Sequence, residues 1–78
     1  IRRGQQMVQR RNYPAALRIA DGILAKFGNK ESMAHYIRGL ALEGLGRRAG
    51  AKKAYQTYLK VDPSGKQADR IKKKLESL

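Results

Sequence analysis

Residues 36–55 read YIRGLALEGLGRRAGAKKAY, and their glycines decide how the fold is interpreted. A glycine inside a helix costs roughly 0.5–1 kcal/mol relative to alanine, so Gly39, Gly44, Gly46 and Gly50 need a reason. Glycines followed by lysines can cradle a phosphate, but GLGRRAG matches neither GxGxxG nor GxxxxGK[ST], and a helical pattern precedes it instead of a strand. We therefore favour the alternative, in which small residues lie where helices meet and turn. The repeat described below assigns Gly39 to a helix contact and Gly46 to a turn, and it gives Gly44 and Gly50 no role.

Apolar residues recur with a helical period along the whole chain, and no stretch alternates as a strand would. We expect an opening helix over residues 1–11 and a second helix over residues 14–27. A third helix is expected from Asn29 to Leu45 and a last helix from Ser64 to Leu78. Between them a fourth helix, with Ala51, Ala54, Tyr55, Tyr58 and Leu59 on one face, is expected to stop at Asp62-Pro63. Asn12, Asn29 and Ser64 are the expected N-terminal caps, with Ser64-x-x-Gln67 as a capping box, and Gly28 and Gly46 are the expected helix ends.

The chain overlays on itself when it is shifted by 35 residues. Five apolar residues of the second expected helix then fall on apolar residues of the fourth: Ala16, Ile19, Ala20, Ile23 and Leu24 fall on Ala51, Ala54, Tyr55, Tyr58 and Leu59. A helix–turn–helix unit that recurs at about this spacing is typical of helical repeat proteins. The identities in the overlay include Arg3-Gly4 with Arg38-Gly39, Ala16 with Ala51, and Leu24 with Leu59.

At these positions the chain resembles the tetratricopeptide repeat (TPR) family. In residues 32–65 the family's signature positions are occupied by Gly39, Gly46, Ala51, Tyr55 and Pro63. Residues 1–31 match less closely: Gly4, Tyr13 and Ala16 fit, but Gly28 replaces the closing proline. Arg38 and Tyr58 also depart from the family, which usually has leucine and alanine there.

The resemblance implies an all-α fold of about five helices, arranged as a right-handed superhelical stack of antiparallel helix pairs. Residues 1–78 would form one domain, with repeat one in 1–31, repeat two in 32–65 and a capping helix in 66–78. About three repeats are usually needed for stability, and the chain begins with Ile1. We therefore expect a fragment from the C-terminal end of a longer array.

The first helix of each pair lines a concave surface in such a stack. The resemblance places an apolar centre with basic flanks in this groove, which suits an extended or helical partner segment that carries acidic residues. For Tyr36, Ile37 and Leu40, a place in the core is an equally good interpretation. Some family members hold a C-terminal carboxylate with basic groove residues, but Met33 and Ile37 occupy the matching positions, so that clamp is not expected. The expected groove residues are Gln5, Val8, Gln9, Met33, Tyr36, Ile37, Leu40, Arg70 and Lys74.

Basic residues gather at the turns within both expected repeats. The turns lie along one edge of a stack, and the end of the last helix would reach the same edge. We hypothesise a basic edge there, although cations are also favoured at helix C-termini for structural reasons and charge runs are often solvated faces. The residues concerned are Arg10, Arg11, Arg47, Arg48, Lys52, Lys53, Lys72 and Lys73.

The composition limits the functions to consider. With 18 lysines and arginines against 6 acidic residues, the formal net charge is +12, which attracts polyanions. The chain has no cysteine and a single histidine, His35, so metal and cofactor sites are not expected, and no catalytic constellation is evident. No apolar run approaches a membrane span and no secretory leader pattern is present. The sequence leaves the compartment unknown, and the cytoplasm is the preferred expectation.

These observations predict a non-catalytic protein-interaction module. The expected partner is another protein with an acidic segment. The alternative is binding of nucleic acid or an anionic surface through the basic edge, which lacks interleaved aromatic residues. Self-association through an exposed repeat face is a further option.

Overall fold

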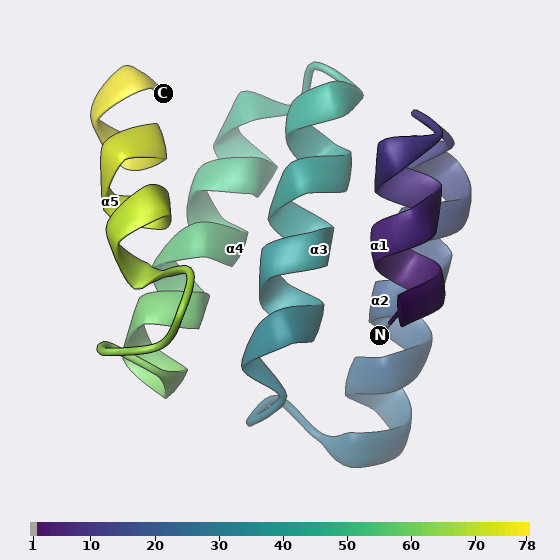
Figure 1. Ribbon diagram of the computed structural model, residues 1–78, viewed down its shortest axis with the longest axis horizontal. Helices are drawn as coiled ribbons and strands as arrows, with labels where there is room; N and C mark the ends of the chain where they lie inside the picture. Colours follow the sequence, from purple (N-terminus) through teal and green to yellow (C-terminus); the bar gives the residue numbers. More distant parts are fainter. Residues whose placement is uncertain (1) are drawn as a thin grey trace.

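The computed structural model describes the backbone of residues 2–78 and the side chains of residues 4–78. This part of the chain is all-α and forms five helices that pack mainly in sequence (Figure 1). Helix α3 also contacts α1, so it lies at the centre of the fold. The helices are α1 (Arg2–Gln9), α2 (Tyr13–Phe27), α3 (Ser32–Gly44), α4 (Arg48–Val61) and α5 (Ala68–Ser77).

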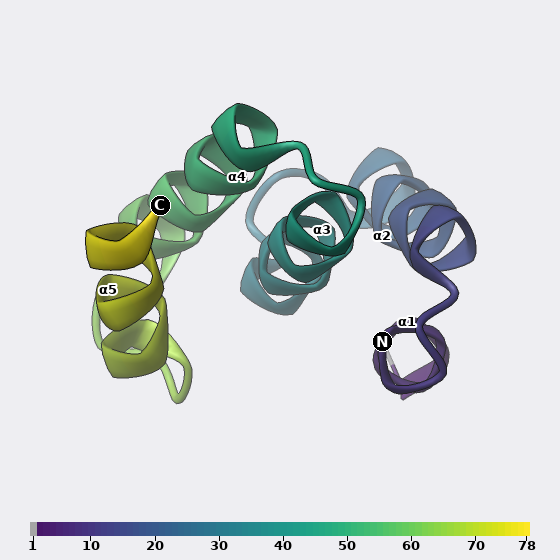
Figure 2. The ribbon, with the colours of Figure 1, turned by 90° about the horizontal axis from the view of Figure 1, so that it is seen from above.

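The helices form an arch when they are seen from above (Figure 2). Helices α2, α3 and α4 make up its upper part, and α1 and α5 descend on either side. Helix α5 packs on α4, and α1 packs on α2 and α3. The inner surface of the arch is therefore shared by α1, α3 and α5.

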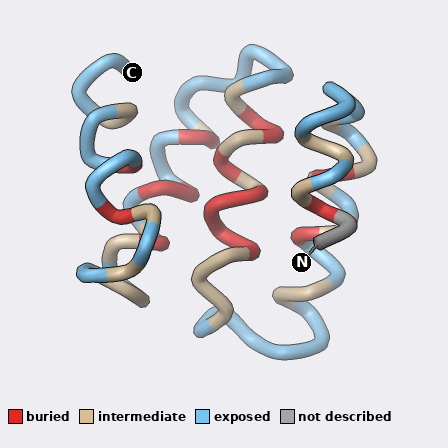
Figure 3. The backbone as a smooth tube through the Cα atoms, viewed as in Figure 1, coloured by how far each residue is buried: buried red, intermediate tan, exposed pale blue. Residues whose placement is uncertain are grey.

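Helix α3 is the most buried element, and Figure 3 shows a long run of buried residues along it. One face packs against Ala16 and Ala20 of α2, and another against Tyr55 and Tyr58 of α4. Small residues on the facing helices let α3 approach closely, which compensates for a core with few large aliphatic side chains. The buried residues of α3 are Ala34, His35, Tyr36, Ile37, Gly39, Ala41 and Leu42.

Gly39 is at a close contact, as expected from the sequence. A Cβ atom built on it would collide with the ring of Tyr55, which is fully buried. Gly44, for which the sequence offered no role, has the same explanation, since its Cβ would collide with the ring of Tyr13 at the start of α2. A Cβ on Gly50 would lie 3.3 Å from Leu42 Cδ1, which is a tight contact that a small movement of Leu42 would relieve.

The turns after α1 and after α3 both contain a residue with positive φ. Gly46 has φ +79°, as expected for a glycine that ends a helix. In the first turn the corresponding residue is Arg11, with φ 59°. Residues with a side chain are disfavoured in this left-handed region, so Arg11 adopts a backbone conformation that arginine does not prefer.

Two of the expected helix starts are wrong. Helix α3 begins at Ser32 after Glu31, not after Asn29, and α5 begins at Ala68 after Gln67, not at Ser64. The expected Ser64 capping box does not form, because the Gln67 N–H instead donates to the Tyr58 hydroxyl at 3.2 Å. Asn12 does precede α2, but its side chain makes no capping hydrogen bond, and Gly28 follows the last residue of α2 as expected.

Candidate binding groove and basic hollow

A groove lies on the inner surface of the arch, between α1, α3 and the start of α5. It encloses about 270 Å³. Most of the residues expected in the groove from the sequence meet here, and Gln67, which the sequence did not single out, joins them. The lining residues are Gln5, Val8, Gln9, Tyr36, Leu40, Gln67 and Arg70.

The groove is lined by a mixture of apolar and polar side chains. Val8 and Leu40 are partly buried, and Tyr36, which is 6% exposed, shows only a small part of its surface here. Gln9 and Arg70 are exposed, so their amide and guanidinium groups are available to a ligand. Such a combination can hold an apolar side chain and hydrogen-bond the backbone beside it.

Three of the expected groove residues lie elsewhere. Ile37 is completely buried between α1 and α2, where it packs with Ala16 and Ala20, so the core interpretation holds for this residue. Met33 packs against the cluster of buried residues around Tyr55. Lys74 lies in a second, neighbouring hollow.

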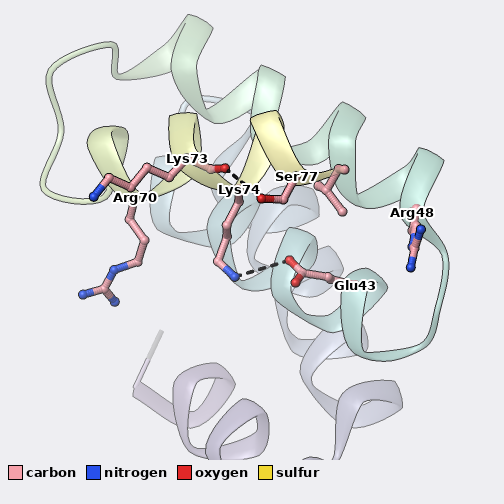
Figure 4. A pocket seen from close by; sticks show the side chains of 7 residues that line it. Glu43, Arg48, Arg70, Lys73, Lys74 and Ser77 are labelled. Carbon is pink, nitrogen blue, oxygen red and sulfur yellow. Dashed lines mark hydrogen bonds and ion pairs between the residues drawn. The ribbon is translucent and has the colours of Figure 1, made fainter.

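The second hollow is larger and basic. It encloses about 680 Å³ between the end of α3, the start of α4 and α5. Figure 4 shows Arg70 and Lys73 on one side and Arg48 on the other, with Lys74 and Glu43 between them. We call this site the basic hollow; it is lined by Glu43, Arg48, Arg70, Lys73, Lys74, Ser77 and Leu78.

Among the described residues that line the basic hollow, Glu43 is the acidic one. Its Oε1 atom accepts a hydrogen bond from the Tyr55 hydroxyl at 2.8 Å. The same atom forms an ion pair with Lys74 Nζ at 3.4 Å. These contacts connect α3 to α4 and to α5. Because both partners use the same oxygen, the carboxylate is held in place within the hollow.

The buried position of Tyr55 changes its acidity. Burial, together with the hydrogen bond to Glu43 and the charge of that carboxylate, raises the pKa of Tyr55 far above its ordinary value of 10.0. The folded protein therefore keeps this phenol neutral at a pH where the unfolded chain loses the proton.

We expect this difference to destabilise the protein at alkaline pH. Above pH 10.0 the unfolded chain releases the Tyr55 proton and the folded protein does not, so the free energy of unfolding falls by up to about 1.4 kcal/mol per pH unit. Below that pH the contribution of Tyr55 to stability is fully retained. Urea unfolding of the wild type and of Tyr55→Phe between about pH 9 and about pH 11 measures the effect, because the variant lacks this phenol. Equal slopes in the two proteins would contradict the assignment.

The basic edge expected from the sequence is only partly assembled. The turns after α1 and α3 and the C-terminal end of α5 lie at the same end of the molecule (Figure 1). Arg10, Arg11, Arg47, Arg48, Lys52, Lys53, Lys72 and Lys73 are all exposed. The basic hollow brings Arg48 together with Lys73, whereas Lys53 lines a different hollow with Asp21 and Arg38.

Few of the cations are neutralised. Among the described residues the ion pairs join Arg38 to Asp21 at 2.9 Å and Lys74 to Glu43 at 3.4 Å. The first pair links α3 to α2 through Arg38, which stands at a position where the TPR family usually has leucine. The arginines of the two turns, Arg10, Arg11, Arg47 and Arg48, form no ion pair within the described part of the chain.

The remaining polar residues do not form a recognisable reaction centre. His35 is buried, and its Nε2–H donates to the backbone oxygen of Asn29 at 2.8 Å, which ties the start of α3 to the preceding turn. In the described residues, no three His, Cys, Asp or Glu side chains are grouped so that they could hold a metal ion. Within the same residues, no helix is both long and apolar enough for a membrane span.

No model of a known protein family matches the chain, and no curated protein or solved structure matches it.

Proposed function

We propose that this chain is a TPR-like repeat module that binds an acidic segment of a partner protein in its groove. In this proposal, residues 1–31 and 32–65 are two repeats, residues 66–78 form a cap, and the helix pairs stack as a right-handed superhelix. The groove between α1, α3 and α5 is the observation that carries the functional part of the proposal.

The geometry of the two turns supports the repeat. After α1, the Arg11 N–H donates to Val8 O and the Asn12 N–H donates to Met7 O. After α3, the same two bonds recur 35 positions later, from Gly46 to Glu43 and from Arg47 to Leu42. The residues before α2 and α4 also share their backbone conformation, with φ −91° and ψ 70° at Asn12 and φ −93° and ψ 73° at Arg47.

The charge of the chain favours an acidic partner. The formal net charge is +12, and Arg70 stands at the edge of the groove. Complementary charge speeds association and disfavours basic competitors, while the apolar walls of Val8 and Leu40 provide the contact that a charged surface alone lacks. A segment with an apolar residue next to acidic residues satisfies both requirements.

Leu40→Glu should strongly weaken the binding of acidic peptides. The new carboxylate would stand in the apolar wall of the groove and repel an acidic segment, so we expect the affinity to fall by at least about tenfold. The experiment selects peptides from a random display library on the wild-type protein and measures their affinity for each variant by fluorescence anisotropy. The control is Leu24→Glu, the same change at a partly buried leucine of α2 outside the groove.

A second variant covers the possibility that Leu40→Glu unfolds the protein. Gln9→Glu changes an exposed groove residue without loss of apolar packing, and it should weaken the same peptides by about twofold or more. Circular dichroism verifies that each variant is folded. If the library yields no peptide, or if the selected peptides bind all folded variants equally, the proposed function is wrong.

Nucleic acid is the second candidate ligand, and the cluster of Arg48, Arg70 and Lys73 in the basic hollow favours it. Against it, Tyr36, Tyr55 and Tyr58 are buried and cannot stack on bases. Nucleic-acid binding would show a steep, linear fall of log affinity with log salt concentration, whereas the peptide interaction should depend on salt only modestly.

A further inference from the structure

The groove and the basic hollow adjoin each other, because Arg70 lines both. A ligand that lies in the groove and continues along α5 would therefore reach Arg48, Lys73 and Lys74. The hollow also contains Leu78, so its surface is not uniformly polar.

The hollow already contains a carboxylate. In the free protein Glu43 forms an ion pair with Lys74. The side chain of Glu43 is 36% exposed and that of Lys74 is 28% exposed, so the ion pair is accessible to solvent and to ligands. The lysine can turn to another carboxylate without breaking the partly buried hydrogen bond between Tyr55 and Glu43. Glu43 thus shows which chemical group the hollow accepts and, at the same time, competes for it.

We propose that the basic hollow binds the acidic residues of the same peptide whose apolar residue occupies the groove, and that Glu43 is an internal competitor that limits this affinity. The inference rests on the proposed function, since it concerns the same ligand. The inference specifies the ligand more closely. The peptide should carry its acidic residues directly next to the apolar residue that binds in the groove, in the part of the peptide that lies along α5. A peptide fits better than a nucleic acid, because the apolar walls of the groove lie next to the cations.

The test is a substitution that should improve binding. Glu43→Gln keeps an oxygen that can accept the Tyr55 hydrogen bond but releases Lys74, so acidic peptides should bind about two- to fivefold more tightly. The matched control is Glu31→Gln, which changes the formal charge equally but precedes the first turn of the same helix, away from the hollow. Arg70→Gln should weaken the acidic peptides by about two- to fivefold or more.

The probes are peptides selected from the random library on the wild-type protein and their twins with Gln and Asn in place of Glu and Asp. Glu43→Gln should improve the acidic peptides, leave the amide twins unchanged, and exceed any effect of Glu31→Gln. If wild type prefers the acidic peptides to their amide twins but Glu43→Gln does not improve their binding, the proposed function stands and the inference about Glu43 is wrong. If wild type binds acidic peptides and amide twins equally, both the acidic preference of the proposed function and the inference about the hollow are wrong.

The remaining outcomes are equally decisive. If Glu43→Gln and Glu31→Gln act alike, the effect is one of net charge and Glu43 is not a competitor. If a labelled single-stranded RNA binds more tightly than every peptide and Glu43→Gln strengthens it, the hollow is a nucleic-acid site and the inference is overturned. If no peptide binds at all, the proposed function itself has failed.

Discussion

Gly39→Ala should destabilise the protein, although alanine is the better helix former. The added Cβ would collide with the ring of Tyr55, and this ring cannot move away because it is fully buried and its hydroxyl is held by Glu43. Overpacking of this kind costs about 1–3 kcal/mol, which outweighs the gain of about 1 kcal/mol in helix propensity. The substitution therefore acts on the contact between α3 and α4, not on α3 alone.

Gly22→Ala is the matched control. Gly22 lies within α2, it is exposed, and no heavy atom lies within 4 Å of the Cβ that alanine would add. This variant should therefore gain about 0.5–1 kcal/mol of stability. Urea unfolding monitored by circular dichroism compares the two variants. Because both gain helix propensity, their stabilities should differ by the overpacking cost at Gly39, about 1–3 kcal/mol, with Gly39→Ala the less stable. A Gly39→Ala protein as stable as Gly22→Ala would show that α3 and α4 are farther apart than the structure places them.

Much of the fold could be predicted from the sequence, because the helical period and the helix-ending glycines are local signals. Gly28 and Gly46 end their helices with positive φ, which follows from the freedom of glycine. The close contact at Gly39 was also predicted, from its position in the resemblance. Arg11 shows the limit of this reasoning: it adopts a positive φ that its residue type does not favour, because the turn and its hydrogen bonds impose it.

The wrong predictions arose where distant residues take over a local role. Ser64 looked like a capping residue, but the tertiary position of Tyr58 supplies a partner for the Gln67 N–H. Gly44 had no local explanation, since Tyr13, which covers it, belongs to the other helix pair. The sequence placed Arg48 and Lys73 at one edge, but it did not join them to Glu43 and Arg70 in a single hollow, because only the packing of α5 brings these residues together.

Ile37→Ala should be among the most destabilising substitutions in this chain, while Leu40→Ala, only three residues away, should affect binding more than folding. Both residues fall at helical spacing on α3, so the sequence pattern could not separate groove from core. In the structure, Ile37 is completely buried, and its Cδ1 atom would lie 3.0 Å from a Cβ on Gly4 of α1. Leu40 is partly exposed and lines the groove.

The expected cost of Ile37→Ala is about 2–5 kcal/mol, because truncation leaves a cavity between α1, α2 and α3 that small residues such as Ala16 and Ala20 cannot fill. A domain of this size has only about 5–15 kcal/mol of stability, so the loss should be visible as a large drop in the urea midpoint. Leu40→Ala should cost less, since part of the leucine is already in contact with water, and the folded variant should bind the selected peptides more weakly than wild type. Equal destabilisation by the two substitutions would contradict the division into core and groove, because it would mean that α3 presents Leu40 to the core as fully as Ile37. If that division holds, the inner face of α3 changes from core to ligand contact within a single turn of the helix.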